Sequence, residues 1–93
     1  MAEYQLEVRP AASKALRKLD AAARTAIVAA MTALEDNPRP VGFCHLKGHR
    51  PFLRVRTGDY RIVYAVDDVA RTVEVAAVGH RSEVYEQLRR IRR

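Results

Sequence analysis

The stretch Phe52–Tyr64 constrains the fold more than any other part of the chain, because it predicts a β-hairpin with a defined register. Gly58-Asp59 is a Gly-X pair between two alternating runs, which is typical of a two-residue type II′ turn. With this turn, the residues that lie opposite one another are Thr57 and Tyr60, Arg56 and Arg61, Val55 and Ile62, Arg54 and Val63, and Leu53 and Tyr64.

This register separates two kinds of side chain, because residues two apart along a strand share one face of a sheet. The apolar face carries Leu53, Val55, Ile62, Tyr64 and Val66, and the other face carries Arg54, Arg56 and Arg61. Like charges directly opposite one another destabilise a sheet, so the pairing of Arg56 with Arg61 predicts a phosphate-binding surface. For any single arginine, a solvated face of a basic protein is the alternative explanation.

A further strand is predicted over Thr72–Val78, after a four-residue loop that spans Asp68–Arg71. The residues paired across this loop are Val66 with Val73, Tyr64 with Val75, and Ile62 with Ala77, and all six then lie on the apolar face. The same register places Val78 beside Arg61. The chain therefore leaves the last strand next to the arginines.

The remaining elements follow from apolar spacing and from helix-end signals. Tyr4–Val8 alternates as a strand does, and Ala11–Leu19 and Ala21–Glu35 have helical spacing. Pro10 suits the start of the first helix and Asp20 the cap of the second.

Ser82 is predicted to cap a final helix that has Val84, Leu88 and Ile91 on its inner face. The expected fold is α+β, with a four-stranded, mainly antiparallel sheet. An N-terminal helix pair packs on one face, and a short C-terminal helix follows, in a single domain over residues 1–93.

Charge and composition restrict the partners. The formal net charge of +6 and the pI of about 10.1 favour nucleic acid, an anionic membrane surface or an acidic protein as partner. Cys44 is the only cysteine, so an intrachain disulfide is excluded. With no long apolar stretch and no secretory signal, we expect a cytoplasmic protein without membrane contact. His45 and His49 lack further ligands at a diagnostic spacing, so neither a metal nor another cofactor is expected.

His80, Arg81 and Tyr85 follow the last strand and complete a candidate site with Arg54, Arg56 and Arg61. Fixed cations stabilise the charge that builds on phosphorus when an adjacent 2′-hydroxyl attacks a phosphodiester. One group must take the hydroxyl proton, and another must protonate the leaving oxygen. Tyrosine and arginine ordinarily have pKa values far above neutrality, and histidine is the one residue type in this set whose ordinary pKa is near it, which makes His80 a candidate for proton transfer. The protein alone is therefore expected to be a weak catalyst that needs help to orient RNA.

Other roles stay open for two of these residues. Tyr85 also fits a packed core aromatic or a platform on which a base stacks. His80 also fits an ordinary residue of a surface loop.

Two segments resemble a known family. Arg54–Tyr64, with its Gly58-Asp59-Tyr60-Arg61 turn, and Val78–Tyr85, with His80-Arg81 and the terminal tyrosine, resemble the RelE branch of the RelE/ParE superfamily of bacterial toxins. The predicted order of elements is also similar, so the resemblance covers nearly the whole chain. At positions 54 and 56, where lysines are common in the family, this chain has arginines, which keep the charge but change its geometry.

The resemblance implies the toxin of a type II toxin–antitoxin pair, which acts as a ribosome-dependent endoribonuclease on mRNA and inhibits translation. The implied partners are a cognate antitoxin and the ribosome with its mRNA and rRNA. It implies catalytic roles for Arg61, Arg81, Tyr85 and His80, and RNA binding by Arg54 and Arg56. Two alternatives remain: a ParE-like inhibitor of DNA gyrase without nuclease activity, and a non-toxic RNA-binding module.

Overall fold

Residues 3–91 are described by a computed structural model of the chain, with the exception of the Ile91 side chain. The elements in chain order are β1 (Gln5–Val8), α1 (Pro10–Arg17), α2 (Ala21–Ala33), β2 (Cys44–His45), β3 (Leu53–Thr57), β4 (Tyr60–Asp67), β5 (Thr72–Gly79) and α3 (Arg81–Ile91). Pro10 begins α1, and the Asp20 carboxylate accepts the Ala23 N–H over 2.8 Å at the start of α2, as predicted.

The sheet has five strands in the order β1-β5-β4-β3-β2, so the prediction of four strands is wrong by one. The missed strand, β2, is only Cys44–His45, which is too short to show a period in the sequence. Strand β1 runs parallel to β5, and the other neighbours are antiparallel. The predicted mixed α+β class is therefore confirmed.

The register of the central hairpin is the predicted one. Arg56 lies opposite Arg61, Val55 opposite Ile62 and Leu53 opposite Tyr64. Gly58 has a φ of 61°, which the first position of a type II′ turn requires and which glycine adopts without strain.

The predicted pairing of Ile62 with Ala77 is wrong. Tyr64 pairs with Val75 as expected, but a bulge then shifts the register, so that Val63 pairs with Ala77 and Ile62 with Val78. One extra residue in β5 turns Ala77 to the opposite face of the sheet. Consequently Gly79, rather than Val78, lies opposite Arg61.

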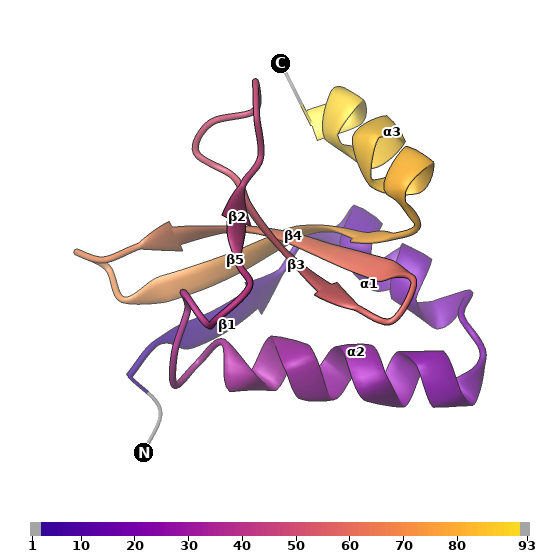
Figure 1. Ribbon diagram of the computed structural model, residues 1–93, viewed down its shortest axis with the longest axis horizontal. Coiled ribbons are helices and arrows are strands. Elements are labelled where there is room, and N and C mark those ends of the chain that lie inside the picture. Colours follow the sequence, from indigo (N-terminus) through magenta and orange to yellow (C-terminus); the bar gives the residue numbers. More distant parts are fainter. Residues whose placement is uncertain (1–2, 92–93) are drawn as a thin grey trace.

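Two apolar clusters cover the two faces of the sheet. The larger joins α1 and α2 to the sheet through residues that include Ala12, Ile27, Met31, Tyr64 and Val75. The smaller joins α3 and the β2–β3 loop to the opposite face through Leu46, Val63, Ala76, Ala77, Val84 and Leu88. Figure 1 shows α2 along the lower face of the sheet and α3 above it. Val84 and Leu88 thus lie on the inner face of α3 as predicted, whereas the Ile91 side chain, Arg92 and Arg93 lie outside the described parts.

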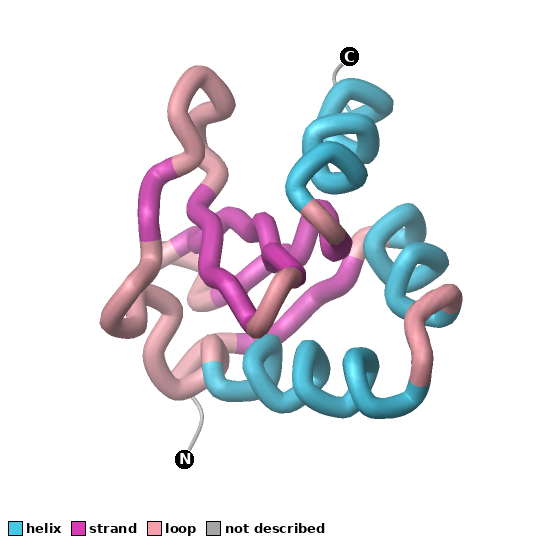
Figure 2. Tube along the Cα trace, turned by 45° about the vertical axis from the view of Figure 1, so that its right-hand side comes forward, coloured by secondary structure: helices cyan, strands magenta, loops and turns pink. Residues whose placement is uncertain are grey.

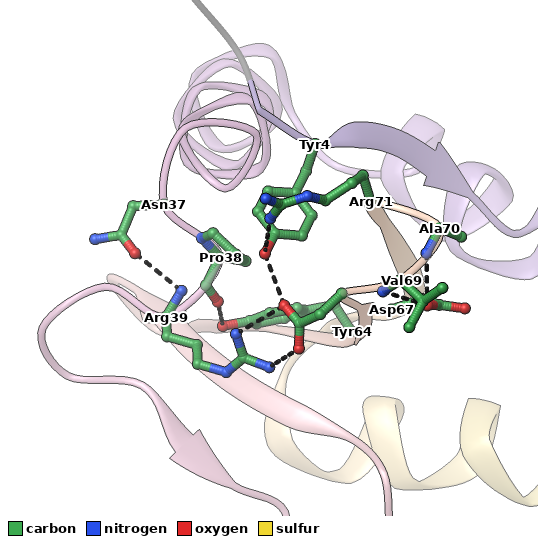
Figure 3. Close-up of polar contacts among 10 residues, drawn as sticks. Tyr4, Asn37, Pro38, Arg39, Tyr64, Asp67, Val69, Ala70 and Arg71 are labelled. Carbon is green, nitrogen blue, oxygen red and sulfur yellow. Dashed lines mark hydrogen bonds and ion pairs between the residues drawn. The ribbon is translucent and has the colours of Figure 1, made fainter.

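A network of polar side chains connects segments that are distant in the sequence where β4 ends (Figure 3). Asp68 accepts hydrogen bonds from the Tyr4 hydroxyl over 2.7 Å and from two nitrogens of Arg39 over 3.3 and 3.0 Å. Arg71 donates to the Tyr4 hydroxyl over 2.8 Å and lies 5.0 Å above the Tyr4 ring. The buried hydroxyl of Tyr64 donates to the Pro38 carbonyl over 2.6 Å. These bonds connect the residue before β1, the segment after α2, strand β4 and the β4–β5 turn.

Candidate functional site

Four arginines converge near the start of β4, at the opposite end of this strand from Asp68. Arg54 and Arg56 come from β3 and Arg61 from β4, and the alternation of these strands points them to the face that carries α3. Arg81 is the first residue of α3. We call Arg54, Arg56, Arg61 and Arg81 the arginine cluster. The structure thus brings together all four arginines that the sequence predicted for the site.

The cluster concentrates positive charge without neutralising it. Partial burial, followed by the charges of Arg56, Arg54 and Arg81, lowers the pKa of the Arg61 guanidinium from its ordinary value, while Tyr85 acts in the opposite direction. Within residues 3–91, none of the ion pairs involves a member of the cluster. An arrangement of this kind favours an incoming anion, because the anion relieves repulsion that the free protein carries.

An open cavity lies beside the cluster. Its volume is about 740 Å³, and its lining consists of Asp59, Arg61, His80, Arg81, Ser82 and Tyr85. The two candidate groups for proton transfer, His80 and Tyr85, therefore share one space with two arginines. Asp59 also lines this space, and the sequence analysis did not place it in the site.

The start of α3 places His80 and Arg81 at the cavity. The His80 carbonyl accepts the Val84 N–H over 3.0 Å, and the Glu83 side chain accepts the His80 N–H over 2.8 Å. His80 is therefore the residue before the first turn, and the prediction that Ser82 caps the helix is wrong. Glu83, three residues after His80, accepts this N–H as the acidic residue of a capping box does, which agrees with the earlier start of the helix.

A second set of contacts fastens α3 to β5. The Gln87 side chain accepts the Val78 N–H over 3.2 Å and donates to the Val78 carbonyl over 2.8 Å, as a neighbouring strand would. Gly79 precedes the helix with a φ of 149°, and a Cβ there would lie 2.7 Å from a carboxylate oxygen of Glu83. These contacts fix the position from which Tyr85 extends.

Two pairs of aromatic rings border the site. The His80 ring packs on Tyr60, with 4.6 Å between centroids and 31° between planes. The Tyr85 ring, which is half-buried, meets the His49 ring at 5.5 Å and 44°. The sequence prediction considered His49 only as a metal ligand and did not place Tyr60 in the site. No local sequence pattern predicts either contact, since each joins two segments that are distant in the sequence.

The donor set does not suit a metal. Within the described part of the chain, no three histidine, cysteine, aspartate or glutamate side chains come together as ligands. The chemistry that this arrangement can supply is electrostatic stabilisation of a phosphate by guanidinium groups, together with proton transfer by an imidazole and a phenol. No helix in residues 3–91 is long and apolar enough to cross a membrane.

The five-stranded mixed sheet and the arginine cluster on one of its faces describe a small basic α+β protein. Comparison with known proteins identifies its family. The model of the family described as the ParE toxin of the type II toxin–antitoxin system parDE matches residues 6–85. The chain therefore belongs to the RelE/ParE superfamily of type II toxins, as the sequence resemblance indicated. No curated protein sequence matches it significantly.

Solved structures agree with this assignment. The free E. coli toxin RelE, in a variant with two arginines replaced by alanine, is 32% identical, with a TM-score of 0.76 over 99% of this chain and 100% of that chain. A RelBE toxin–antitoxin complex from Mycobacterium tuberculosis has 29% identity and a TM-score of 0.76 over 85% and 99% of the two chains. The intact E. coli RelBE complex has 29% identity and a TM-score of 0.71 over 83% and 95%.

Proposed function

We propose that this toxin is a ribosome-dependent endoribonuclease that cuts mRNA and so inhibits translation. The observation that carries the proposal is the arginine cluster, with Arg56 directly opposite Arg61, beside a cavity that Tyr85 and His80 also line. A sheet surface with opposed like charges destabilises the free protein, so we attribute it to a ligand that supplies several phosphates.

The proposed reaction is attack of a 2′-hydroxyl on the adjacent phosphorus. The bond from the 2′ oxygen to phosphorus forms and the bond from phosphorus to the 5′ oxygen breaks, which leaves a cyclic phosphate and a 5′-hydroxyl. Arg61 and Arg81 stabilise the added negative charge on the phosphate, and Arg54 and Arg56 hold the flanking backbone. His80 and Tyr85 are the groups assigned to proton transfer, one from the attacking hydroxyl and one to the leaving oxygen.

The ribosome supplies what the site lacks. A phenol and a guanidinium ordinarily have pKa values far above neutrality, so they are slow proton-transfer groups at neutral pH. Orientation of the reactants can compensate for much of this deficit, because holding them in the reactive geometry removes most of the entropic barrier. We therefore assign to the ribosome the positioning of the mRNA in the cavity. The net charge of +6 suits contact with rRNA.

Inhibition of DNA gyrase is the second candidate, because the family model that matches residues 6–85 is that of the ParE toxin. The fold is common to both activities and does not separate them. The cationic face with Tyr85 favours the ribonuclease, since a protein that binds another protein has no need for proton-transfer groups beside opposed arginines.

The two candidates are separated with purified components. We expect end-labelled mRNA to be cut when it is bound to ribosomes and to stay intact without them, and gyrase to keep its supercoiling activity. Arg61→Ala should reduce cutting about 10²–10³-fold, whereas Arg17→Ala should not reduce it, because Arg17 is exposed on α1 and its guanidinium donates to Ser13. Intact mRNA together with accumulating gyrase–DNA cleavage complexes would establish the gyrase activity instead.

We also propose that a cognate antitoxin silences this toxin, since relatives in two of the solved structures are complexes of toxin and antitoxin. The expected inhibitor is disordered alone and folds along the toxin as a helix or an added strand. It either places acidic groups against the arginine cluster or displaces α3, which carries Tyr85.

Affinity measured across a salt series distinguishes these two routes. If acidic groups pair with the arginines, binding weakens as salt rises. If α3 is displaced, affinity changes little, because the apolar contacts of Val84 and Leu88 are exchanged for similar ones. Failure of the folded toxin to bind the protein encoded beside it would contradict the proposed pair.

A further inference from the structure

The connection between β2 and β3 is a compact loop with a well-fixed backbone. The Leu46 N–H donates to the Phe52 carbonyl over 2.9 Å, the His49 N–H to the Leu46 carbonyl over 3.0 Å, and the Phe52 N–H to the His49 carbonyl over 2.9 Å. Both backbone groups of His49 are therefore bonded. The loop rises from the sheet on the same side as α3, as Figure 2 shows.

Apolar packing joins this loop to α3. Leu46 is buried with Val84 and Leu88 in one cluster, and Phe52 and Tyr85 pack against it. The loop and the helix are thus held at a fixed separation, with the Tyr85 ring packed against the cluster that they share. At that separation the His49 ring contacts the Tyr85 ring, with 5.5 Å between centroids.

The three histidines of the chain contact three different aromatic rings. His45 meets Phe43 at 5.7 Å and His80 meets Tyr60 at 4.6 Å, whereas His49 meets Tyr85. His49 is half-buried, and His45 and His80 are exposed. The contact with Tyr85 is therefore specific to one histidine, and His45, in the adjacent strand β2, offers a control position that does not contact Tyr85.

The orientation of Tyr85 matters because proton transfer needs the hydroxyl within hydrogen-bond reach of the reacting oxygen. The position of α3 fixes the Cα of Tyr85 but leaves a choice among staggered side-chain rotamers. We propose that His49 is a positioning residue, whose ring holds Tyr85 in the rotamer that lines the cavity with Arg61. This inference rests on the proposed function, since it concerns the part of Tyr85 in cleavage.

The test is single-turnover cleavage of ribosome-bound mRNA over a range of toxin concentrations. Misplacement of a reacting group is costly, so we expect His49→Ala to lower the maximal rate about 10-fold while the half-saturating toxin concentration stays unchanged. His49→Phe should restore the rate, because it restores a ring against Tyr85. His45→Ala is the matched control and should cleave at the wild-type rate.

A double variant, with His49→Ala added to Tyr85→Phe, shows whether His49 acts through Tyr85. In Tyr85→Phe the hydroxyl is absent, so adding His49→Ala should have no further effect. If His49→Ala does not fold, His49→Gln replaces it, since glutamine keeps a polar side chain but supplies no ring.

Each remaining outcome overturns the inference. A wild-type cleavage rate in folded His49→Ala or His49→Gln would do so. So would a 10-fold loss of rate when His49→Ala is added to Tyr85→Phe, or a failure of His49→Phe to restore the rate. A wild-type protein that cuts no mRNA on the ribosome would overturn the proposed function as well. The two failures are therefore distinguishable.

Discussion

At one end of β4, beside Asp68, two arginines bond to other side chains, and one of them forms an ion pair. Arg39 makes two bonds to the Asp68 carboxylate and Arg71 bonds to Tyr4, which itself donates to Asp68. The bonds from Arg39 and then Tyr4 lower the pKa of the Asp68 carboxyl from its ordinary value, and the Asp68 bond raises the pKa of Arg39. Nearby, burial raises the pKa of the Tyr64 hydroxyl to about 12, so this group stays protonated and keeps its bond to Pro38.

At the other end of the same strand, the arginine cluster has the opposite electrostatics. Arg61 faces Arg56 directly, and the neighbouring charges act with burial to lower the pKa of Arg61. The end with paired charges connects three segments of the chain and so contributes to stability. The end with like charges costs stability, and we attribute its retention to a ligand. Substitutions at the two ends should therefore affect different measurements.

The largest expected effect is on the cleavage rate. Replacing an arginine by alanine at each end of β4 should separate this effect from an effect on stability. Arg61→Ala should lower the cleavage rate about 10²–10³-fold, as loss of a preorganised donor to a transition-state charge does. Its folded state should persist, and removal of a like-charged neighbour should raise the free energy of unfolding by roughly 0.2–1 kcal/mol. Arg39→Ala should instead keep the cleavage rate and lower the unfolding temperature.

Circular dichroism and the single-turnover rate together decide this comparison. An Arg61→Ala variant that unfolds, or one that cleaves at the wild-type rate, would remove Arg61 from the site.

The same contrast can be drawn with two tyrosines. Tyr85→Phe should reduce cleavage about 10²-fold through loss of a proton-transfer group, with little change in stability. Tyr4→Phe removes a hydroxyl that bonds to Asp68 and Arg71, so we expect about 1 kcal/mol less stability and unchanged cleavage. Urea unfolding checks the second effect. Equal loss of activity in both variants would mean that the two ends of β4 are not independent.

Low pH should weaken the network at the Asp68 end of β4 and so lower the free energy of unfolding. Because the pKa of Asp68 is lower in the folded state, the unfolded state binds more protons around this pKa. The resulting stability is fully present above the ordinary aspartate pKa of about 3.9 and is lost as the pH falls through the lower folded-state value.

We therefore expect Asp68→Asn to lack this part of the acid destabilisation in urea unfolding measured at a series of pH values. Arg39→Ala should lose most of the same part, because the Arg39 bond is the largest cause of the shift. A difference between wild type and Asp68→Asn that does not vary with pH would contradict the pairing.

The smallest effect concerns salt. Screening weakens repulsion within the arginine cluster, so added salt should stabilise the free toxin slightly. The response should shrink in Arg56→Ala and Arg61→Ala and persist in Arg17→Ala, whose guanidinium donates to Ser13 on α1. An identical salt response in Arg56→Ala and wild type would show that the repulsion is negligible.

Much of this architecture was predictable because apolar alternation determines a register. The alternation of Leu53, Val55, Ile62 and Tyr64 excludes a one-residue slip, and the two-residue turn at Gly58-Asp59 then sets Arg56 against Arg61. The bulge in β5 was not predictable, since Ala76 and Ala77 are small enough to pack against either face. The extra residue left no signal in the hydrophobic pattern.

Most of the contacts that sequence reasoning missed are tertiary, and one is local. The local contact is the bond from the His80 N–H to the Glu83 side chain three residues later, which marks the start of α3 at Arg81, whereas Ser82 has the better intrinsic preference for a cap. The contact of His49 with Tyr85 arises because Leu46 and Phe52 pack on α3, and the pairing of Asp68 with Arg39 joins residues 29 positions apart. Local spacing carries no information about such pairs.

The central claim, that the arginine cluster acts on RNA in translation, is tested most directly by pulse-labelling after the toxin is induced. We expect methionine incorporation to stop before thymidine incorporation, and Arg61→Ala to leave both unchanged. If thymidine incorporation stops first while methionine incorporation continues, the target is DNA synthesis and the claim is contradicted.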